Sequence, residues 1–185
     1  SVLSSTTMDG SLPGKEGCMN PLIQKIILAT DFSEASQDAI IYAKCISGSL
    51  AAELKILHVF EPGGWMVPSP YYYTPGFEDW VDASIENTRQ KGKEALKTLA
   101  ESFGTHTETI FIEGDPGKEI VRVAAEQNAD LLILGTHGYT GWNHLTMGSI
   151  AEYVVRHSPC PVLTIKPTAA SRSETYTSPV SARND

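Results

Sequence analysis

Three glycines and a serine have the spacing of a loop that leads into a helix and binds an anion. Gly135 and Gly138 follow an apolar run, and Gly148 and Ser149 come after nine intervening residues. Glycine lets a backbone turn sharply and approach a ligand, and the first N–H groups of a helix attract anions. Ser149 adds a hydroxyl that can donate to a phosphate oxygen. The alternative is structural: these residues end a strand, turn a loop and cap a helix.

Asp31 is a second candidate for ligand binding. It follows the apolar run 25–30 directly, so its carboxylate would lie where a buried strand leaves a sheet. There it could accept hydrogen bonds from a ligand. The alternative is that Asp31 caps a helix that begins after Ser33.

No group of residues predicts a catalytic centre or a metal site. His137 and His144 lack the i, i+4 spacing of helical zinc ligands, and Cys18, Cys45 and Cys160 form no Cys-x-x-Cys motif. The sequence has no Gly-x-Ser-x-Gly elbow, no Walker A lysine and no Gly-x-Gly-x-x-Gly after the first apolar run. We therefore assign no catalytic residue and expect binding rather than rapid turnover.

Apolar runs and helical periods alternate through the middle of the chain. The predicted strands are 25–30, 53–60, 106–114, 131–135 and 162–165. Helices are predicted after Ser33, over 78–103, after Asp115 and over 148–157. Their apolar stripes should face the core, with Tyr42 in the first helix and Ile150 and Val155 in the last among the inward residues.

This alternation predicts an α/β fold, an open, doubly wound, Rossmann-like sheet of five parallel strands with helices on both faces. Strands separated by helices run parallel through right-handed crossovers. Such sheets bind ligands beyond the carboxyl ends of the strands, where the strand order reverses. Asp31 and the glycine loop after 131–135 are therefore candidates for one site.

Composition narrows the class of protein and its partners. The 185 residues carry a net charge of −8 and are 41% hydrophobic, which is typical of a globular domain. No apolar run approaches the roughly 18 residues of a membrane helix, and no basic patch offsets the acidic charge. Membranes and nucleic acids are therefore not expected partners. Without a secretion signal, and with an odd number of widely spaced cysteines, we expect a cytoplasmic protein with reduced thiols.

The two ends differ from the middle. Residues 1–18 and 168–185 are polar and show no periodic apolar pattern, so we expect a flexible leader and a flexible C-terminal tail around a folded domain, 19–167. Met19 is a candidate for the natural start of the protein. If the protein starts there, the leader is not native.

Four separated segments resemble the ATP-binding branch of the universal stress protein family. That branch is marked by Gly-x2-Gly-x9-Gly-(Ser/Thr), which the glycine loop matches without insertion. The segments occur in the order expected for the family, and they are KIILATDFSEAS (25–36), LHV (57–59), DLLILGTHG (130–138) and GSIAEYVVRHSPCPVLTIK (148–166).

The resemblance implies an adenine nucleotide lying across the carboxyl edge of the sheet. It places Asp31 and the main chain of Val59 at the adenine, and Gly135 beside the ribose. The residues that it assigns to the phosphates are Gly138, Gly148, Ser149 and the N–H of Ile150.

The loop departs from the family pattern in its charge. Many relatives carry arginine between the second and third motif glycines, whereas Asn143 and His144 stand here and the loop has no Lys or Arg. We expect ATP, with Mg²⁺ held by its phosphates to supply the missing positive charge. AMP or cyclic AMP is the alternative ligand. Slow hydrolysis or transfer at a phosphate of ATP is the alternative function, disfavoured because nothing in the loop neutralises developing charge.

The resemblance also implies a homodimer. Its interface would be the terminal strand, made of Val162, Leu163, Thr164 and Ile165, since an apolar edge strand needs a partner. Such a dimer would be a stress-response switch or adaptor for an unidentified client protein. The aromatic segment 62–80 either forms a partner surface, covers the adenine side as a lid, or packs on its own domain.

Overall fold

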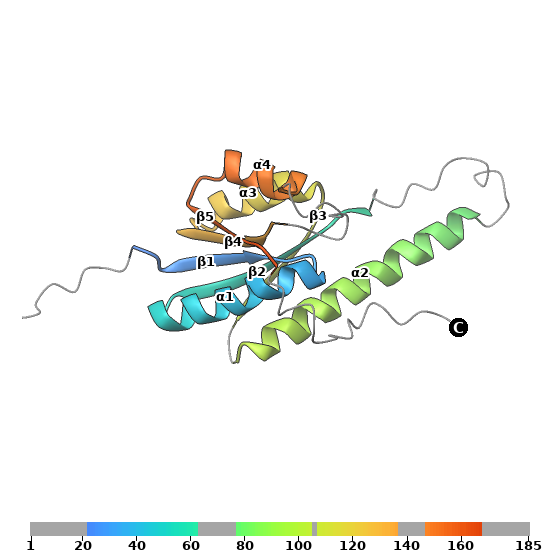
Figure 1. The fold of residues 1–185 in the computed structure, drawn as a ribbon. Helices are drawn as coiled ribbons and strands as arrows, with labels where there is room; N and C mark the ends of the chain where they lie inside the picture. The colour runs from blue at the N-terminus through green and yellow to red at the C-terminus, as the bar shows by residue number, and fades with distance from the viewer. Residues whose placement is uncertain (1–21, 63–76, 105–106, 137–146, 168–185) are drawn as a thin grey trace, which may run out of the picture.

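Strands and helices alternate along the chain in the predicted order (Figure 1). The computed structural model describes residues 22–62, 77–104, 107–136 and 147–167. Its elements are β1 (Lys25–Ala29), α1 (Glu34–Leu50), β2 (Glu53–Phe60), α2 (Phe77–Ser102), β3 (Glu108–Glu113), α3 (Pro116–Glu126), β4 (Leu131–Gly135), α4 (Ser149–His157) and β5 (Val162–Ile165). The predicted leader, the C-terminal tail and Gly138 lie outside the described residues, as does most of the aromatic segment.

The five strands form one parallel sheet in the order β3-β2-β1-β4-β5, which confirms the doubly wound fold. The chain builds outward from β1 to β3 and then returns to the other side of β1. The strand order therefore reverses between β1 and β4. Ala29, the last residue of β1, pairs with Leu57 on one side and Leu134 on the other, so the residues that follow these three lie at one edge of the sheet.

Alternate residues of each central strand enter two separate cores. In β1, Ile26 and Leu28 pack against α1 and α2, whereas Ile27 and Ala29 pack against α3 and α4. Figure 1 shows these two helix pairs on opposite faces of the sheet. Continuous apolar runs are expected for strands that are buried on both faces, which is why the strands could be predicted from sequence.

Local signals set several element boundaries. The Oδ1 atom of Asp115 accepts from the main-chain N–H of Lys118 at 3.1 Å, and Pro116 occupies the first turn of α3. Gly104, with φ of 97°, follows the end of α2, and it adopts a left-handed conformation that glycine tolerates.

Helix α2 is held against β2 and β3 by charged side chains. Arg89 Nε lies 2.6 Å from Glu113 Oε1, and its guanidinium lies over the Phe60 ring, while Lys93 lies over Phe111. The N-terminal half of α2 extends past the carboxyl edge of the sheet (Figure 1). No helix of the described ranges combines the length and the apolar composition needed to cross a bilayer.

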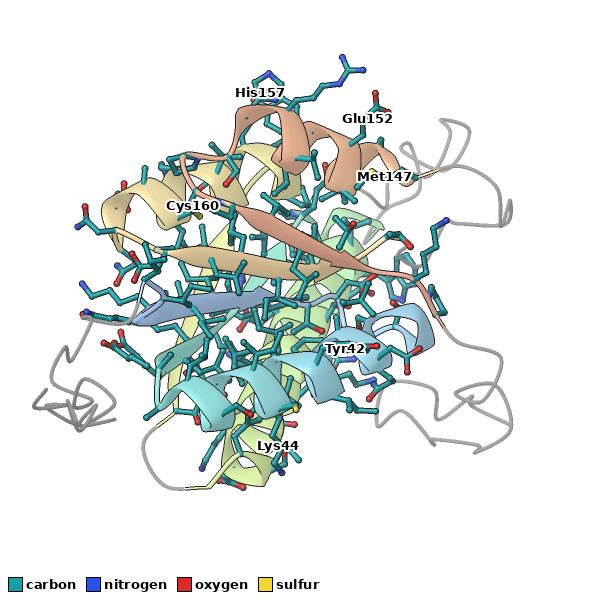
Figure 2. All side chains as sticks on the ribbon, turned by 60° about the vertical axis from the view of Figure 1, so that its left-hand side comes forward. Tyr42, Lys44, Met147, Glu152, His157 and Cys160 are labelled. Atoms are coloured by element: carbon teal, nitrogen blue, oxygen red, sulfur yellow. The ribbon has the colours of Figure 1, made fainter. Side chains whose placement is uncertain are left out.

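Three residues that we predicted to face the core are exposed instead. Tyr42 is 48% exposed, Ile150 43% and Val155 47%. Each lies at the border of its helix's apolar stripe, and the neighbouring elements cover only a narrower band. In α4 that band is Ala151 and Val154. Figure 2 shows the outer surface of the same helix, where Glu152 and His157 point away from the sheet.

Candidate functional site

A cavity of about 290 Å³ lies at the carboxyl edge of the sheet, where the strand order reverses. Its walls come from the ends of β1, β2 and β4 and from the first turns of α3 and α4. Six of the seven residues predicted for the site line it, namely Asp31, Val59, Gly135, Gly148, Ser149 and Ile150. The seventh, Gly138, lies outside the described residues.

The start of α4 presents main-chain N–H groups to this cavity. Gly148 is the N-cap, with extended φ and ψ of −63° and 149°, and Ser149 is the first helical residue. Among the described residues, none accepts a hydrogen bond from the N–H of Ser149, Ile150 or Ala151. Unpaired N–H groups and the helix dipole together make a seat for an anion.

The N–H of Gly148 is not available in this way. It donates to the carbonyl of Thr136 at 2.8 Å, which ties the start of α4 to the end of β4. The resemblance assigns Gly148 to the phosphates, but its N–H already has a partner within the protein. Its contribution to the site is to place the following N–H groups and to leave the approach without a side chain.

The start of α3 also borders the cavity, and the sequence reasoning missed it. Pro116 and Ile120 line the cavity beside Ala151. The signal was available, because every helix of a right-handed parallel βαβ unit begins at the carboxyl edge of the sheet. Two helix N-termini therefore direct their positive ends toward one space.

Asp31 holds the turn before α1, whose N-cap is Ser33, and its side chain is not the cap itself. Its Oδ1 atom accepts from the N–H of Ser33 at 3.0 Å and from the hydroxyl of Ser33 at 2.7 Å, just before α1 begins. The residue also lines the cavity. Phe32, between them, has a φ of 62°, which a bulky side chain rarely adopts. The turn is thus tightly specified, and it sets the direction of the Asp31 side chain.

Buried hydroxyls hold this turn from beneath. Thr30 Oγ1 accepts from the N–H of Phe32 at 3.1 Å and lies 3.2 Å from Ser36 Oγ, which in turn donates to the carbonyl of Ser33 at 2.8 Å. Thr30 and Ser36 are 7% and 2% exposed. Within the described ranges, no buried side-chain nitrogen or oxygen lacks a hydrogen-bond partner. Such a network fixes one conformation, because breaking any member leaves a buried polar group unpaired.

The main chain of Val59 faces the space beyond the end of β1. The carbonyl of Leu57 accepts from Thr30 of the β1 side, and the carbonyl of Phe60 accepts from Gly114 of the β3 side. Alternate residues of β2 therefore bond to opposite neighbours, and Val59 faces β1 after that strand has ended. Among the described residues, no main-chain partner meets Val59 there.

Charge at the site comes from carboxylates. Among its described lining residues are Asp31 and Glu61 but no lysine, arginine or histidine. An anion would therefore be held by N–H and hydroxyl groups. The described part of the chain contains no cluster of histidine, cysteine and acidic side chains that could hold a metal ion. Of its cysteines, Cys45 and Cys160 are both unpaired thiols.

Comparisons with known proteins find similar sequences over most of the chain. The sequence profile of the universal stress protein family matches residues 22–166. The universal stress protein MJ0531 of Methanocaldococcus jannaschii is 36% identical over 148 residues, which are 78% of this chain and 83% of the relative.

Two solved structures extend the comparison to the fold. The universal stress protein UspA from Lactobacillus plantarum has a TM-score of 0.66 at 26% identity and covers 78% of this chain and 98% of its own. A universal stress protein in complex with cyclic AMP has a TM-score of 0.51 at 24% identity and covers 79% of this chain and 98% of its own.

Proposed function

Because the chain belongs to the universal stress protein family, we propose that it is a regulatory protein that binds an adenine nucleotide in the cavity at the carboxyl edge. The observation that carries the proposal is the group of N–H donors of Ser149, Ile150 and Ala151 at the cavity wall. They have the chemistry that a phosphate needs, and the same cavity is lined by Asp31 and Val59, which are suited to a base.

Each end of the nucleotide has its own set of groups. We assign the adenine to the Asp31 carboxylate, which accepts from an exocyclic amine, and to the main chain of Val59. The ribose lies by Gly135. We assign the phosphates to Gly138, to the N–H groups of Ser149 and Ile150 and to the Ser149 hydroxyl, while Gly148 leaves the approach without a side chain. The apolar side chains of Ala29, Leu57 and Leu134 supply a surface for the base.

ATP with Mg²⁺ is the ligand we favour. The negative charge of the lining makes AMP or cyclic AMP, which carry less charge than ATP, the second candidate. Asp31 and Glu61 repel a triphosphate, and no described lining residue carries a compensating positive charge. Mg²⁺ bound to the phosphates would supply that charge. One protein of the same fold was solved in complex with cyclic AMP, which carries a single negative charge.

The nucleotide would act as a signal and not as a substrate for rapid turnover. Among the described lining residues no lysine, arginine or histidine could stabilise a transferring phosphoryl group. We propose a cytoplasmic homodimer whose nucleotide occupancy changes the surface it offers to a client protein. Hydrolysis of ATP, if it occurs, is expected to be slow.

Ser149→Pro tests the phosphate site with little disturbance of the fold. Proline is favoured at the first position of a helix, and the extended conformation of Gly148 suits the residue before a proline. The change removes both the N–H and the hydroxyl, whereas the matched variant Ser149→Ala removes the hydroxyl alone. By calorimetry with ATP and Mg²⁺, we expect Ser149→Pro to weaken affinity about tenfold or more and Ser149→Ala about two- to tenfold.

The same titrations with AMP and cyclic AMP, with and without Mg²⁺, rank the ligands. If ATP binds more tightly than AMP and cyclic AMP only when Mg²⁺ is present, the ligand is the magnesium complex of ATP. If AMP binds as tightly as ATP, the less charged ligand is favoured. If Ser149→Pro bound all three nucleotides as tightly as the wild-type protein, the phosphate site would be refuted.

A further inference from the structure

His58 lies directly beneath the turn that carries Asp31, on the face of the sheet opposite the cavity. Its imidazole ring packs between Phe32, at a centroid distance of 4.5 Å, and Phe111, at 5.7 Å. Gly92 of α2 lies beside it, and a Cβ atom there would be 3.5 Å from His58 Nε2. The ring is therefore held on three sides and has little freedom to turn.

The hydrogen bond of this ring defines its protonation. Nδ1 lies 2.8 Å from the carbonyl oxygen of Thr30. A carbonyl only accepts, so Nδ1 must carry a proton and donate. Burial lowers the pKa of His58 below its ordinary value, even though the bond to Thr30 and the charge of Asp31 both act to raise it. A neutral imidazole protonated at Nδ1 is thus the form present near pH 7.

This bond takes the Thr30 carbonyl away from the sheet. In a regular parallel ladder, that carbonyl would accept from the N–H of Val59, two residues beyond Leu57. Here His58 holds it, and no main-chain bond joins Val59 to Thr30. The ladder between β1 and β2 therefore ends one step early. The main chain of Val59 is left facing the side of the sheet where β1 has ended.

Thr30 is fixed at every polar group as a result. Its N–H donates to Leu57, its carbonyl accepts from His58, and its hydroxyl joins Phe32 and Ser36. Since Asp31 follows directly, the direction of its carboxylate is set by this anchored residue.

We propose that His58 is a positioning residue for the base of the nucleotide: it holds the Thr30 carbonyl, and thereby aims Asp31 and keeps the Val59 main chain open to the ligand. The inference rests on the proposed function. His58 does not touch the ligand itself, because it lies on the other face of the sheet.

The pair His58→Asn and His58→Gln separates the donor from the rest of the side chain. Asparagine places an amide nitrogen near the position of Nδ1, whereas glutamine places it near Nε2 and leaves the Thr30 carbonyl without its donor. We expect His58→Gln to weaken ATP affinity about three- to tenfold, the effect of one lost hydrogen bond, and His58→Asn to stay within about twofold of wild type. Phe111→Leu, which loosens the packing and keeps the donor, is the control and should behave like wild type.

A second probe, inorganic tripolyphosphate, distinguishes positioning of the base from a general weakening of the fold. It meets the phosphate seat alone, so we expect His58→Gln to leave its affinity unchanged, while Ser149→Ala weakens both probes. Combined with Asp31→Ala, His58→Gln should add little further loss of ATP affinity, because both act on the same contact.

Three results would overturn the inference. The first is that His58→Gln weakens the affinity for ATP and for tripolyphosphate equally. The others are that His58→Asn and His58→Gln bind ATP equally well, or that the losses of ATP affinity in His58→Gln and Asp31→Ala are additive. If His58→Gln does not fold, His58→Leu replaces it with the same expectations. Wild-type protein that binds neither probe would instead refute the proposed function, and this inference with it.

Discussion

Single residues at this site act through the main chain more than through charge. The N–H groups of Ser149 and Ile150 and the backbone of Val59 are the main-chain polar groups available to a ligand in the cavity, and the carbonyl of Thr30 accepts from His58 behind it. Side chains such as Ser36 and His58 then fix where that main chain lies. Substitutions behind the cavity are therefore expected to matter as much as those in its wall.

The pKa of His58 predicts a pH dependence of stability. Because burial lowers this pKa, the unfolded chain binds the proton more tightly than the folded one. The free energy of unfolding should therefore fall as pH drops from about 6.5 to the lower pKa of the folded state, and should not change in that interval in His58→Asn. Urea unfolding at a series of pH values measures this.

The carboxylates provide an internal control for that experiment. Hydrogen bonds from the main chain of Lys118 lower the pKa of Asp115, and those from Gln24 and Lys25 lower the pKa of Asp130. Their stabilising effect is lost only below the ordinary range of an aspartate, near 4. A loss of stability between pH 6.5 and 5 that persists in His58→Asn would contradict the assignment to His58.

Residues that line the cavity could be predicted from sequence, but the groups that position them could not. Asp31 and Ser149 were found because each follows or begins an element at the edge where ligands bind. The bond from His58 to Thr30 joins residues that are 28 positions apart, and its partner is a main-chain atom that every residue has. No pattern in the chain marks such a pair.

At the scale of elements, the cavity depends on how closely α3 and α4 approach each other. Gly117 of α3 makes that approach possible, since a Cβ atom there would lie 3.0 Å from Cδ1 of Tyr153 in α4. The Tyr153 ring is itself stacked on His157 at 4.1 Å, so it has little room to withdraw. Both helices contribute their first turns to the cavity.

Gly117→Val is predicted to separate these helices. We expect it to lower the free energy of unfolding by about 1–3 kcal/mol, the usual cost of overpacking, and to weaken ATP binding. Gly48→Ala in α1 is the matched control, because nothing lies within 4 Å of the added Cβ. That change should stabilise the protein by about 0.5–1 kcal/mol and leave binding alone. Chemical denaturation measures the free energy of unfolding of both variants. Equal changes in the two variants would contradict the role given to Gly117.

The elements themselves were largely predictable, and the errors have one cause. Apolar runs such as 53–60 and 131–135 became strands because a strand buried on both faces needs apolar side chains throughout. The helical stripes were drawn too wide at Tyr42 and Val155, which are exposed. Periodicity tells which side of a helix is apolar, but the width of the covered band depends on neighbours that only the fold brings together.

At the scale of the whole molecule, the sheet ends at β5 with one edge unpaired within the described chain. Leu132 and Thr136 of the β4 side donate to the carbonyls of Pro161 and Ile165. Alternate residues of β5 direct their main-chain groups to opposite sides. Because Pro161 and Ile165 bond to β4, the N–H and carbonyl of Thr164 face the outer edge. Val162, Leu163 and Thr164 are each partly exposed there. This edge is the proposed dimer interface.

Thr164→Pro is predicted to produce monomers. Proline removes the outward N–H without breaking the bonds from β4 to β5, whereas the control Thr164→Val keeps that N–H. Sedimentation equilibrium should give a dimer for wild type and Thr164→Val and a monomer for Thr164→Pro. A wild-type monomer, or a dimer that survives the proline, would show that β5 is not the interface.

The location of the ligand can be read residue by residue in an NMR titration of the ¹⁵N-labelled wild-type protein with ATP and Mg²⁺. We expect the amide signals of Asp31, Val59, Gly135, Ser149 and Ile150 to shift and saturate together, while those of Lys25 and Glu53, at the opposite edge of the sheet, stay in place. Signals that do not move, or shifts that gather away from the start of α4 and the end of β1, would contradict a nucleotide site in this cavity.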